Sequence, residues 1–462
     1  MRCTTSAAAP GFCPSSPPHA AVSEALAQLN DCATLPATPP PRAVLSTIQK
    51  LGFSVTLAYV FLRFSFLHEF ITAKTGFDTH LSVLFYSLSY LACLFSGRAL
   101  AAWRSRSAVI WVLFSLCMCL ATVTSFWRGG SFPVTSDYIR TALPLLFVFP
   151  ALIVTPAQLE KVLNTIGIAG IAIVILGLIT DTFKGGRLAL DALGSIGNSN
   201  DYAAHLTFVL PAIAFLTLAQ PRNFIVKALG IASIGMGLFE ILSTGSRGGL
   251  IGLIVMGIYV FFSCSAKLKV FLVVVLPAAA LCCIPFLPGE AATRLASMFS
   301  SNAQTSEAAD SQESRLALLR ESIKATTEHP ILGVGPGVFM DYEGAVAEQN
   351  GGRGLWHVTH NSYTQVSSEC GLPAFVLYIC GVTGAFLALR RSSKSTNPAI
   401  SRLARVLVIG MSGLCTCMIF LSNAYSANIL ALAGIAIAIR QIDSDSDEQR
   451  TDVATQRDVA LA

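Results

Sequence analysis

Two apolar runs, LKVFLVVVLPAAALCCIPFL at residues 268–287 and LPAFVLYICGVTGAFLAL at residues 372–389, flank a long polar stretch, residues 288–371. Each run has about the 20 residues that a helix needs to cross the hydrocarbon core of a bilayer. A polar connection as long as this one is typical of a functional or a disordered segment. Because it contains a helical pattern, turn residues and several arginines and histidines, we expect a folded lobe that carries the active site.

The composition is that of a membrane protein. Of the 462 residues, 53% are hydrophobic and only 12% are charged, whereas a soluble domain carries about 25% charged residues. The basic residues are not clustered with interleaved aromatic residues, so a nucleic-acid partner is not expected. We therefore predict an all-α polytopic protein whose partner is the lipid bilayer.

Apolar segments of spanning length predict twelve transmembrane helices, of which the first is interrupted by Arg63, His68 and Glu69. Their ranges are 51–72, 79–97, 108–126, 137–154, 163–180, 202–219, 226–243, 248–264, 268–287, 372–389, 403–421 and 424–440. Residues 1–45 are rich in proline, alanine, serine and threonine, lack the pattern of a cleaved signal peptide, and are predicted to form a disordered tail.

The distribution of lysine and arginine predicts the orientation. Loops after even-numbered spans carry thirteen of these residues and short loops after odd-numbered spans carry five. Both termini are therefore expected in the cytoplasm and the 288–371 loop outside. The predicted parts are the 1–45 tail, spans 1–9 in 46–287, the outer catalytic loop 288–371, spans 10–12 in 372–440, and the tail 441–462. An outer site has no nucleotide sugars, which favours a donor that is already activated, such as a lipid-linked diphosphate.

No metal centre is expected. Most of the thirteen cysteines lie in apolar runs, where cysteine acts as a small hydrophobic residue, and neither C-x-C pair (Cys117/Cys119 and Cys415/Cys417) has a second pair or nearby histidines. The outer side also lacks D-x-D and H-E-x-x-H patterns. Cationic side chains would then have to stabilise a diphosphate leaving group, without a metal or other cofactor.

Two motifs lie where predicted spans begin. In Gly194–His205, Asn200 or Asp201 can cap the helix, and the alternative to a plain helix start is a polar rim at the mouth of a cavity. In Ser243–Gly249, placing the charge of Arg247 in the membrane costs free energy unless its guanidinium reaches the interface or an anion. Its glycine neighbours and the helix N-terminus predict a phosphate site, but an arginine that merely extends to the interface remains equally compatible with the pattern.

A third motif is a predicted loop helix at 311–328, with Asp310 and Glu313 at capping-box spacing. Arg315 lies at the edge of its apolar stripe, where it can point into a cleft, and Arg320 lies further round towards solvent. The helix is expected to stop at His329-Pro330.

The fourth motif is Thr359–Tyr363. His360 can accept a proton from an acceptor hydroxyl, and Asn361 or Ser362 can cap the helix that follows. Glu369 lies half a helical turn off the face of His360, so a direct pair is not implied. The glycine-rich segment 333–337 does not fit a nucleotide-binding loop and predicts a turn.

Taken in order, these motifs resemble the O-antigen ligase and polymerase superfamily of bacterial envelope glycosyltransferases. The resemblance covers about residues 45–440 and rests on four elements: Gly197-Asn198-x-Asn200, Ser246-Arg247-Gly248-Gly249, Arg315 ahead of His329–Gly337, and His360–Tyr363 with Glu369-x-Gly371. It implies a GT-C-type helical membrane fold in the inner membrane, with the active site facing the periplasm.

The resemblance also implies a reaction. A glycan would pass from undecaprenyl diphosphate to an acceptor with inversion and without a metal. Arg247 and Arg315 would hold the diphosphate and His360 would be the base. Further substrate-binding residues are expected among Asn200, Ser246, Asn361, Arg320 and Glu369.

The acceptor is left open by the sequence. It is lipid A–core in ligases, another lipid-linked glycan in polymerases, and serine or threonine in protein O-oligosaccharyltransferases. Transport of a polysaccharide is a less favoured reading, because transporters place ionisable residues near mid-membrane and show internal repeats, and neither is evident here. An inactive scaffold is disfavoured because every motif is present.

Overall fold

The computed structural model describes residues 47–461 except 181, 185, 192, 220, 264 and 299–305, and gives only the backbone at 182, 184, 271, 306–312 and 447–461. The predicted tail at 1–45 lies outside the described residues.

The described chain is almost entirely helical. Its elements are α2 (Thr47–Ser65), α3 (Leu67–Thr75), α4 (Leu81–Phe95), η1 (Ala101–Arg104), α5 (Arg106–Val123), α6 (Arg128–Asp137), η2 (Tyr138–Ala142), α7 (Leu145–Leu152), α8 (Pro156–Thr180), β1 (Thr182–Lys184), β2 (Arg187–Ala189), α9 (Ser199–Leu218), α10 (Phe224–Ser243), α11 (Arg247–Ser263), α12 (Ala266–Val270), η3 (Phe271–Val275), α13 (Leu276–Cys283), η4 (Ile284–Phe286), α14 (Gly289–Ala296), α15 (Ser306–Glu328), α16 (Phe339–Gln349), α17 (Ser362–Ser392), α18 (Pro398–Cys417) and α19 (Ala427–Leu461). β1 and β2 form an antiparallel hairpin in which Phe183 pairs with Leu188.

The predicted class is confirmed: this is an all-α, multi-pass membrane protein. Eight described helices are long and apolar enough to cross a bilayer, or nine if the bent pair α2–α3 counts as one span, and α4 and α11 are shorter apolar helices. The predicted number of twelve spans stays a prediction.

Two examples show that a predicted span need not be one regular α-helix. The segment predicted at 51–72 bends by 63° between α2 and α3, because Phe66 adopts a left-handed backbone with φ 52°. The segment predicted at 137–154 divides into the π-helical turn η2 and α7, with Pro144 between them. A proline removes a backbone donor and breaks the regular ladder of hydrogen bonds.

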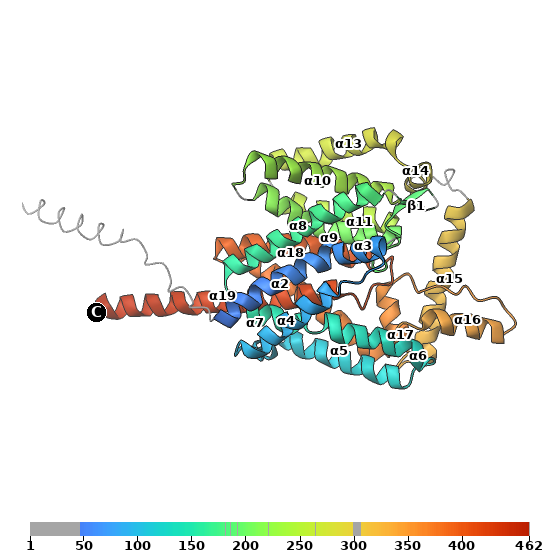
Figure 1. Ribbon diagram of the computed structural model, residues 1–462, viewed down its shortest axis with the longest axis horizontal. Helices are drawn as coiled ribbons and strands as arrows, with labels where there is room; N and C mark the ends of the chain where they lie inside the picture. The colour runs from blue at the N-terminus through green and yellow to red at the C-terminus, as the bar shows by residue number, and fades with distance from the viewer. Residues whose placement is uncertain are drawn as a thin grey trace, which may run out of the picture. The chain divides into compact units, whose positions relative to one another are not determined.

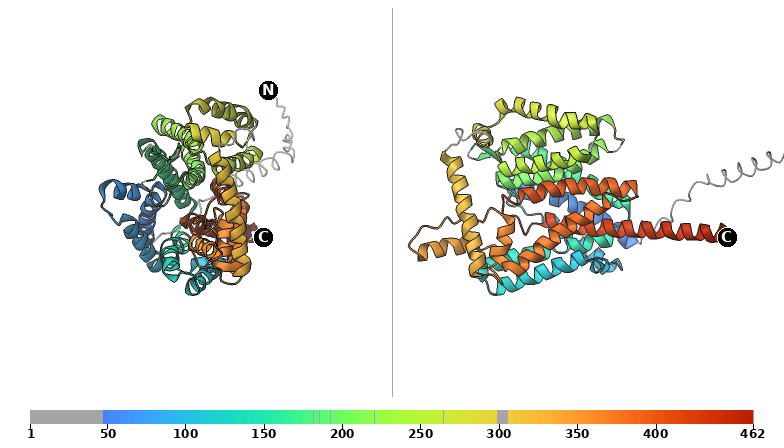
Figure 2. Two further views of the ribbon diagram at one scale, coloured as in Figure 1. Left: turned by 90° about the vertical axis from the view of Figure 1, so that its right-hand side faces the viewer. Right: turned by 180° about the vertical axis from the view of Figure 1, so that it is seen from behind.

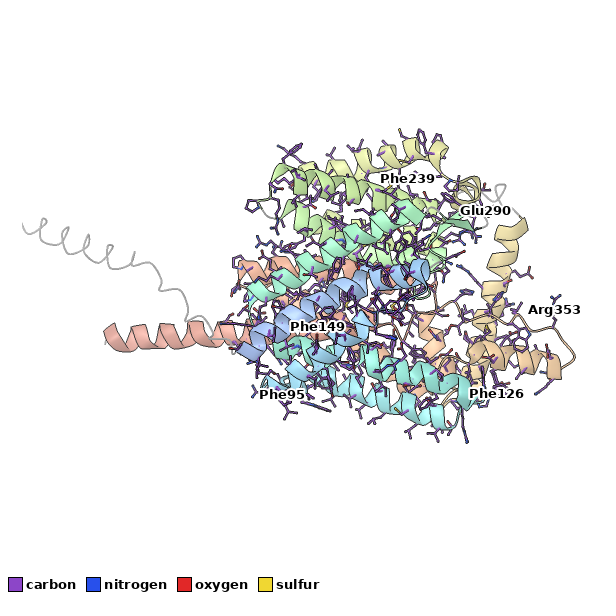
Figure 3. All side chains as sticks on the ribbon, viewed as in Figure 1. Phe95, Phe126, Phe149, Phe239, Glu290 and Arg353 are labelled. Atoms are coloured by element: carbon purple, nitrogen blue, oxygen red, sulfur yellow. The ribbon has the colours of Figure 1, made fainter. Side chains whose placement is uncertain are left out.

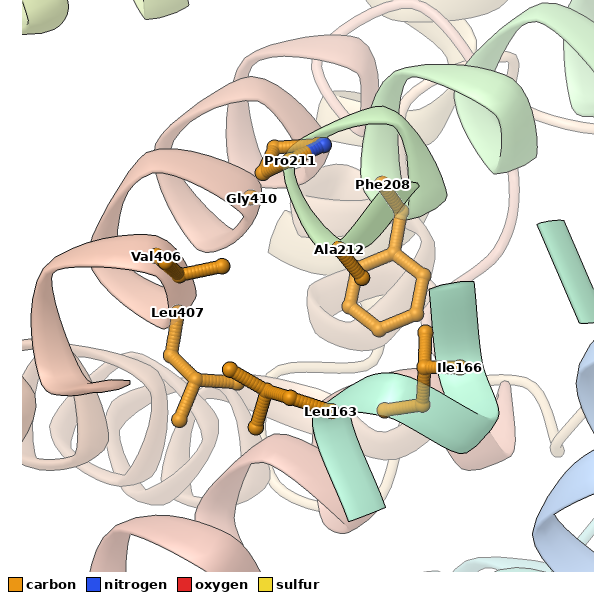
Figure 4. A pocket seen from close by; sticks show the side chains of 8 residues that line it. All are labelled: Leu163, Ile166, Phe208, Pro211, Ala212, Val406, Leu407 and Gly410. Atoms are coloured by element: carbon orange, nitrogen blue, oxygen red, sulfur yellow. The ribbon is translucent and has the colours of Figure 1, made fainter. Parts of the chain in front are cut away.

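The spanning helices pack side by side, with α8 against α9, α11 against α18 and α17 against α5 (Figure 1). Small residues allow close approach in the membrane: a Cβ added to Gly252 of α11 would lie 3.1 Å from the backbone oxygen of Gly413 in α18. Between α8, α9 and α18 a small cavity is lined only by apolar residues such as Leu163 and Phe208 (Figure 4). It offers no polar group for chemistry.

The polar elements gather at one end of the bundle. Helices α14, α15 and α16 and the β-hairpin lie there, while the C-terminal half of α19 leaves from the opposite end (Figure 1). Seen end-on, α15 runs across the end of the bundle (Figure 2). Glu290 and Arg353 mark this end and Phe95 marks the other (Figure 3). We call the polar end, from α14 to the start of α17, the lobe.

Candidate active site

Arg247 stands at the first position of α11, where the sequence predicts a helix start. The buried Ser246 hydroxyl accepts the N–H of Gly249 at 3.2 Å and so caps the helix. Gly248 is needed for packing, because a Cβ there would lie 2.8 Å from that of Phe420. The Arg247 guanidinium donates to the Ser297 hydroxyl at 2.8 Å. This bond turns Arg247 towards the lobe.

A second arginine, Arg294, lies beside the first. Ser297, which accepts from Arg247, donates its hydroxyl to the carbonyl of Arg294 at 2.8 Å. The Arg294 side chain is only 10% exposed and lies 3.9 Å from the carboxylate of Glu290, one helical turn away in α14. Arg294 is not among the predicted site residues, and the i,i+4 spacing of Glu290 and Arg294 is a signal for an ordered helix there.

A third arginine, Arg187 of β2, borders the segment that leads into α11. Its Nε donates to the carbonyl of Thr244 at 2.8 Å, and Nη2 donates to the Asn200 side-chain oxygen at 3.2 Å. The prediction that Asn200 or Asp201 caps α9 is wrong. Asn198 is the cap, since its side-chain oxygen accepts the N–H groups of both residues. Asn200 is thereby left to orient Arg187.

The fourth arginine, Arg315, comes from α15. This helix ends at Glu328, as predicted, but begins at Ser306, five residues before the predicted start, and the side chain of Asp310 lies outside the described residues. Arg315 is half-buried, and burial, followed by the charges of Arg294 and Arg247, lowers its pKa. Three guanidinium groups are therefore close enough to repel one another.

We call Arg187, Arg247, Arg294 and Arg315 the arginine cluster. Like charges are held together at a cost unless an anion binds among them, and arginine recognises phosphate oxygens in a bidentate manner. Arg320 lies on the exposed side of α15 and faces solvent, as predicted. Its expected role in substrate binding stays a prediction.

His360 lies next to this cluster. Burial, followed by the charges of Arg315 and then His357, lowers its pKa to about 4. Its imidazole is therefore neutral near pH 7 and able to accept a proton. The backbone of His360 is left-handed, with φ 52°, a conformation that non-glycine residues rarely adopt outside functional or strained sites.

The start of α17 fixes His360 in place. Asn361 caps the helix by accepting the N–H groups of Tyr363 and Thr364, as predicted. The Ser362 hydroxyl donates to the carbonyl of Leu421 at 2.6 Å and accepts the N–H of Asn423 at 2.9 Å. The segment that receives these bonds also contains Phe420, against which Gly248 packs. Arg247 and His360 are thus held by the same connection between α18 and α19.

The glycine-rich turn at residues 333–337 forms backbone hydrogen bonds with α17. Val334 and Gly335 donate their N–H groups to the carbonyls of Ser368 and Glu369, both at 2.9 Å. A Cβ at Gly371 would clash with the carbonyl of Ile331, and Gly371 itself has φ 84° at a kink in α17. We call residues 333–337 together with 369–371 the glycine clamp.

Glu369 completes the glycine clamp. It is 3% exposed, and its carboxylate accepts the N–H of Gly337 at 2.8 Å and the hydroxyl of Tyr425 at 2.7 Å. These bonds give Glu369 a structural place between α17 and the turn. The role in substrate binding expected for it stays a prediction.

The part of the chain that the structure describes contains no group of three or more histidine, cysteine, aspartate or glutamate side chains that could hold a metal ion. Its chemically distinctive features are the arginine cluster and the adjacent histidine. Together they can bind a multiply charged anion and accept a proton close to it.

Comparison with known proteins gives a match to a family model. No curated protein matches the chain. Residues 231–379 match the family model described as O-antigen ligase. The matched range contains Arg247, Arg294, Arg315 and His360, and it leaves Arg187 and Asn200 outside. Residues 231–379 therefore carry an O-antigen ligase domain.

Proposed function

We propose that the protein is a glycosyltransferase that moves a glycan from undecaprenyl diphosphate to an acceptor hydroxyl, with inversion and without a metal. The observation that carries this proposal is the pairing of the arginine cluster with a neutral histidine beside Arg315. The match of residues 231–379 to a family model described as O-antigen ligase supports a glycan as the substrate.

The arginine cluster supplies the leaving-group chemistry. A diphosphate gains negative charge as its bond to the sugar breaks, so donors aimed at its oxygens bind the transition state more tightly than the ground state. Arg247 and Arg315 come from separate helices, α11 and α15, and Arg294 lies between them along the chain. The cluster can therefore contact both phosphates from different directions.

His360 supplies the proton acceptor. The acceptor oxygen attacks the anomeric carbon as the bond from that carbon to the phosphate oxygen breaks. The electron pair of the broken bond passes to the diphosphate, and the hydroxyl proton passes to the imidazole of His360. Attack from the face opposite the leaving group inverts the anomeric configuration.

We further propose that the lobe faces the periplasm from the inner membrane. The excess of lysine and arginine in loops on the other side supports this orientation. The departure of α19 from the bundle end opposite the lobe is consistent with a C-terminus inside (Figure 1). A donor anchored in the membrane then reaches the site from the bilayer.

The proposal is tested by transfer in vitro with purified protein, undecaprenyl-diphosphate-linked glycan and a chelator. Lipid A–core, a second lipid-linked glycan and a serine-rich peptide serve as parallel acceptors and separate ligase, polymerase and protein transferase. Product on one acceptor despite chelator is expected. If no acceptor is modified, and glycan export in cells does not depend on His360, the transfer proposal fails and transport becomes the better account.

A further inference from the structure

One exposed aromatic side chain stands apart from the proposed chemistry. Trp356 is 42% exposed and precedes His360 by only four residues. A single exposed apolar residue needs no explanation by itself. Trp356, however, lies in the lobe, in the segment that follows Arg353 at its outer end (Figure 3), and its surroundings hold it in one position.

The backbone at Trp356 is fixed by a buried carboxylate. Glu343 of α16 is 7% exposed, and its oxygens accept the N–H of Leu355 at 3.0 Å and the N–H of Trp356 at 2.9 Å. Trp356 has φ 53°, a left-handed conformation that is unusual for a bulky residue and persists only where the surroundings enforce it. Trp356 and His360, two left-handed residues, thus stand within one five-residue segment.

Glycines form the support under the indole. A Cβ added to Gly344 would clash with the ring atoms of Trp356, so the ring packs directly on the backbone of α16. A Cβ at Gly354 would lie 3.1 Å from the indole nitrogen. One side of the ring is therefore covered by a flat backbone surface, and the exposed fraction belongs to the rest of the ring. The result is a rigid aromatic platform.

We propose that Trp356 is a saccharide-stacking residue of the acceptor site. The C–H groups on one face of a sugar ring are apolar and pack well on a flat aromatic ring, while the hydroxyls around its edge stay solvated. An indole with one supported face and one accessible face has the form that such stacking needs.

The chain geometry favours the acceptor over the donor. This inference rests on the proposed function, in which the donor diphosphate occupies the arginine cluster and the acceptor hydroxyl faces His360. Four residues of chain span at most about 14 Å, a distance that a short oligosaccharide covers. A sugar on Trp356 therefore fits the same acceptor molecule whose hydroxyl reaches His360.

The test compares Trp356→Ala, Trp356→Phe and Gly344→Ala with the wild-type protein in the transfer reaction, with the KM for acceptor and for donor measured separately. We expect Trp356→Ala to raise the acceptor KM about tenfold, which corresponds to about 1.4 kcal/mol, and to leave the donor KM unchanged. Trp356→Phe should retain part of the affinity. Gly344→Ala should raise the acceptor KM with the tryptophan still present, because the added methyl group displaces the ring.

Trp103 of η1 is the matched control, since it is 46% exposed and lies outside the lobe. Trp103→Ala should leave both KM values unchanged, and thermal unfolding should show that each variant is folded. Binding of soluble core oligosaccharide and of the soluble donor repeat unit, followed by calorimetry, gives a readout that needs no turnover.

An unchanged acceptor KM in Trp356→Ala, with an active wild-type protein, would overturn the inference and leave the proposed function intact. A rise in the donor KM alone would overturn the assignment to the acceptor. A wild-type protein that transfers glycan to no acceptor would overturn the proposed function itself.

Discussion

The arginine cluster and the glycine clamp lie in the same polar part of the molecule and are both built from sequence motifs, but they differ in how their charges are satisfied. In the glycine clamp, the carboxylate of Glu369 is buried and accepts bonds from Gly337 and Tyr425. On Arg315, by contrast, the structure records no side-chain hydrogen bond or ion pair among the described residues, and burial, followed by two neighbouring guanidiniums, lowers its pKa.

This difference suggests a structural role for the glycine clamp and a ligand-binding role for the arginine cluster. A buried carboxylate with its partners in place stabilises one arrangement of the chain, whereas like charges brought close together repel one another and favour the binding of an anion. Glu369 and Gly371 therefore hold the lobe on α17, and in the proposed function Arg315 with its neighbours binds the anion. The two regions should respond differently to substitution.

Of the effects that separate the two regions, the largest is expected at Arg315. Arg315→Ala should lower the rate of transfer by about 10²–10³, the usual result of removing one donor from a charge-stabilising site, while the unfolding temperature stays near that of wild type. Lys324→Ala is the matched control on the same helix, because Lys324 is an exposed cation with no predicted role in the site. If the two variants lost the transfer rate equally, the proposed difference in role between the buried and the exposed face of α15 would be wrong.

A smaller effect, on stability, is expected in the glycine clamp. Glu369→Gln should destabilise the fold by about 1–3 kcal/mol, since it weakens bonds to buried donors. Gly371→Ala should destabilise it more, because the new Cβ meets the carbonyl of Ile331 in a left-handed backbone. Thermal unfolding in detergent measures both.

The control for the glycine clamp is Gly384→Ala on the same helix, where a Cβ meets nothing within 4 Å. It should leave stability unchanged or slightly raised. The turnover of the folded fraction should be near wild type in Glu369→Gln. A folded Glu369→Gln protein with abolished turnover would place this carboxylate in the chemistry.

The smallest expected effect is a difference between the pH dependence of kcat/KM and that of kcat. The free protein holds the pKa of His360 at about 4, partly through the charge of Arg315, so kcat/KM for the donor should fall only as the pH drops towards 4. A bound diphosphate offsets the charge of Arg315 and raises the pKa of His360, so kcat should fall at a higher pH. Since kcat/KM reports the free enzyme and kcat the complex, coincident profiles would refute coupling between the two residues.

The candidate site residues that lie in sequence motifs occupy the local positions that the sequence predicts. Arg247 at a helix start, Arg315 on the inner edge of a loop helix and His360 before the capping Asn361 all occupy the expected local positions. Arg294 was missed, because its role depends on a hydrogen bond from Arg247 to Ser297 across 50 residues, and no local pattern reports such a contact.

Other differences have the same origin. Asn198 rather than Asn200 caps α9, and only the structure shows that Asn200 is engaged by Arg187. The apolar pattern at 51–72 predicted one span, yet tertiary packing keeps Phe66 in a left-handed conformation and bends the helix. Composition determined the class of fold, while bends and contacts between distant arginines depend on packing that hydropathy does not encode.

The most direct test of the account measures donor binding and glycan transfer on the same preparations of wild-type, His360→Ala and Arg315→Ala protein, with His357→Ala as control. The account predicts that His360→Ala still binds undecaprenyl-diphosphate-linked glycan but loses transfer by about 10²–10⁴, and that Arg315→Ala loses both. A folded His360→Ala protein that transfers glycan at the wild-type rate would contradict it.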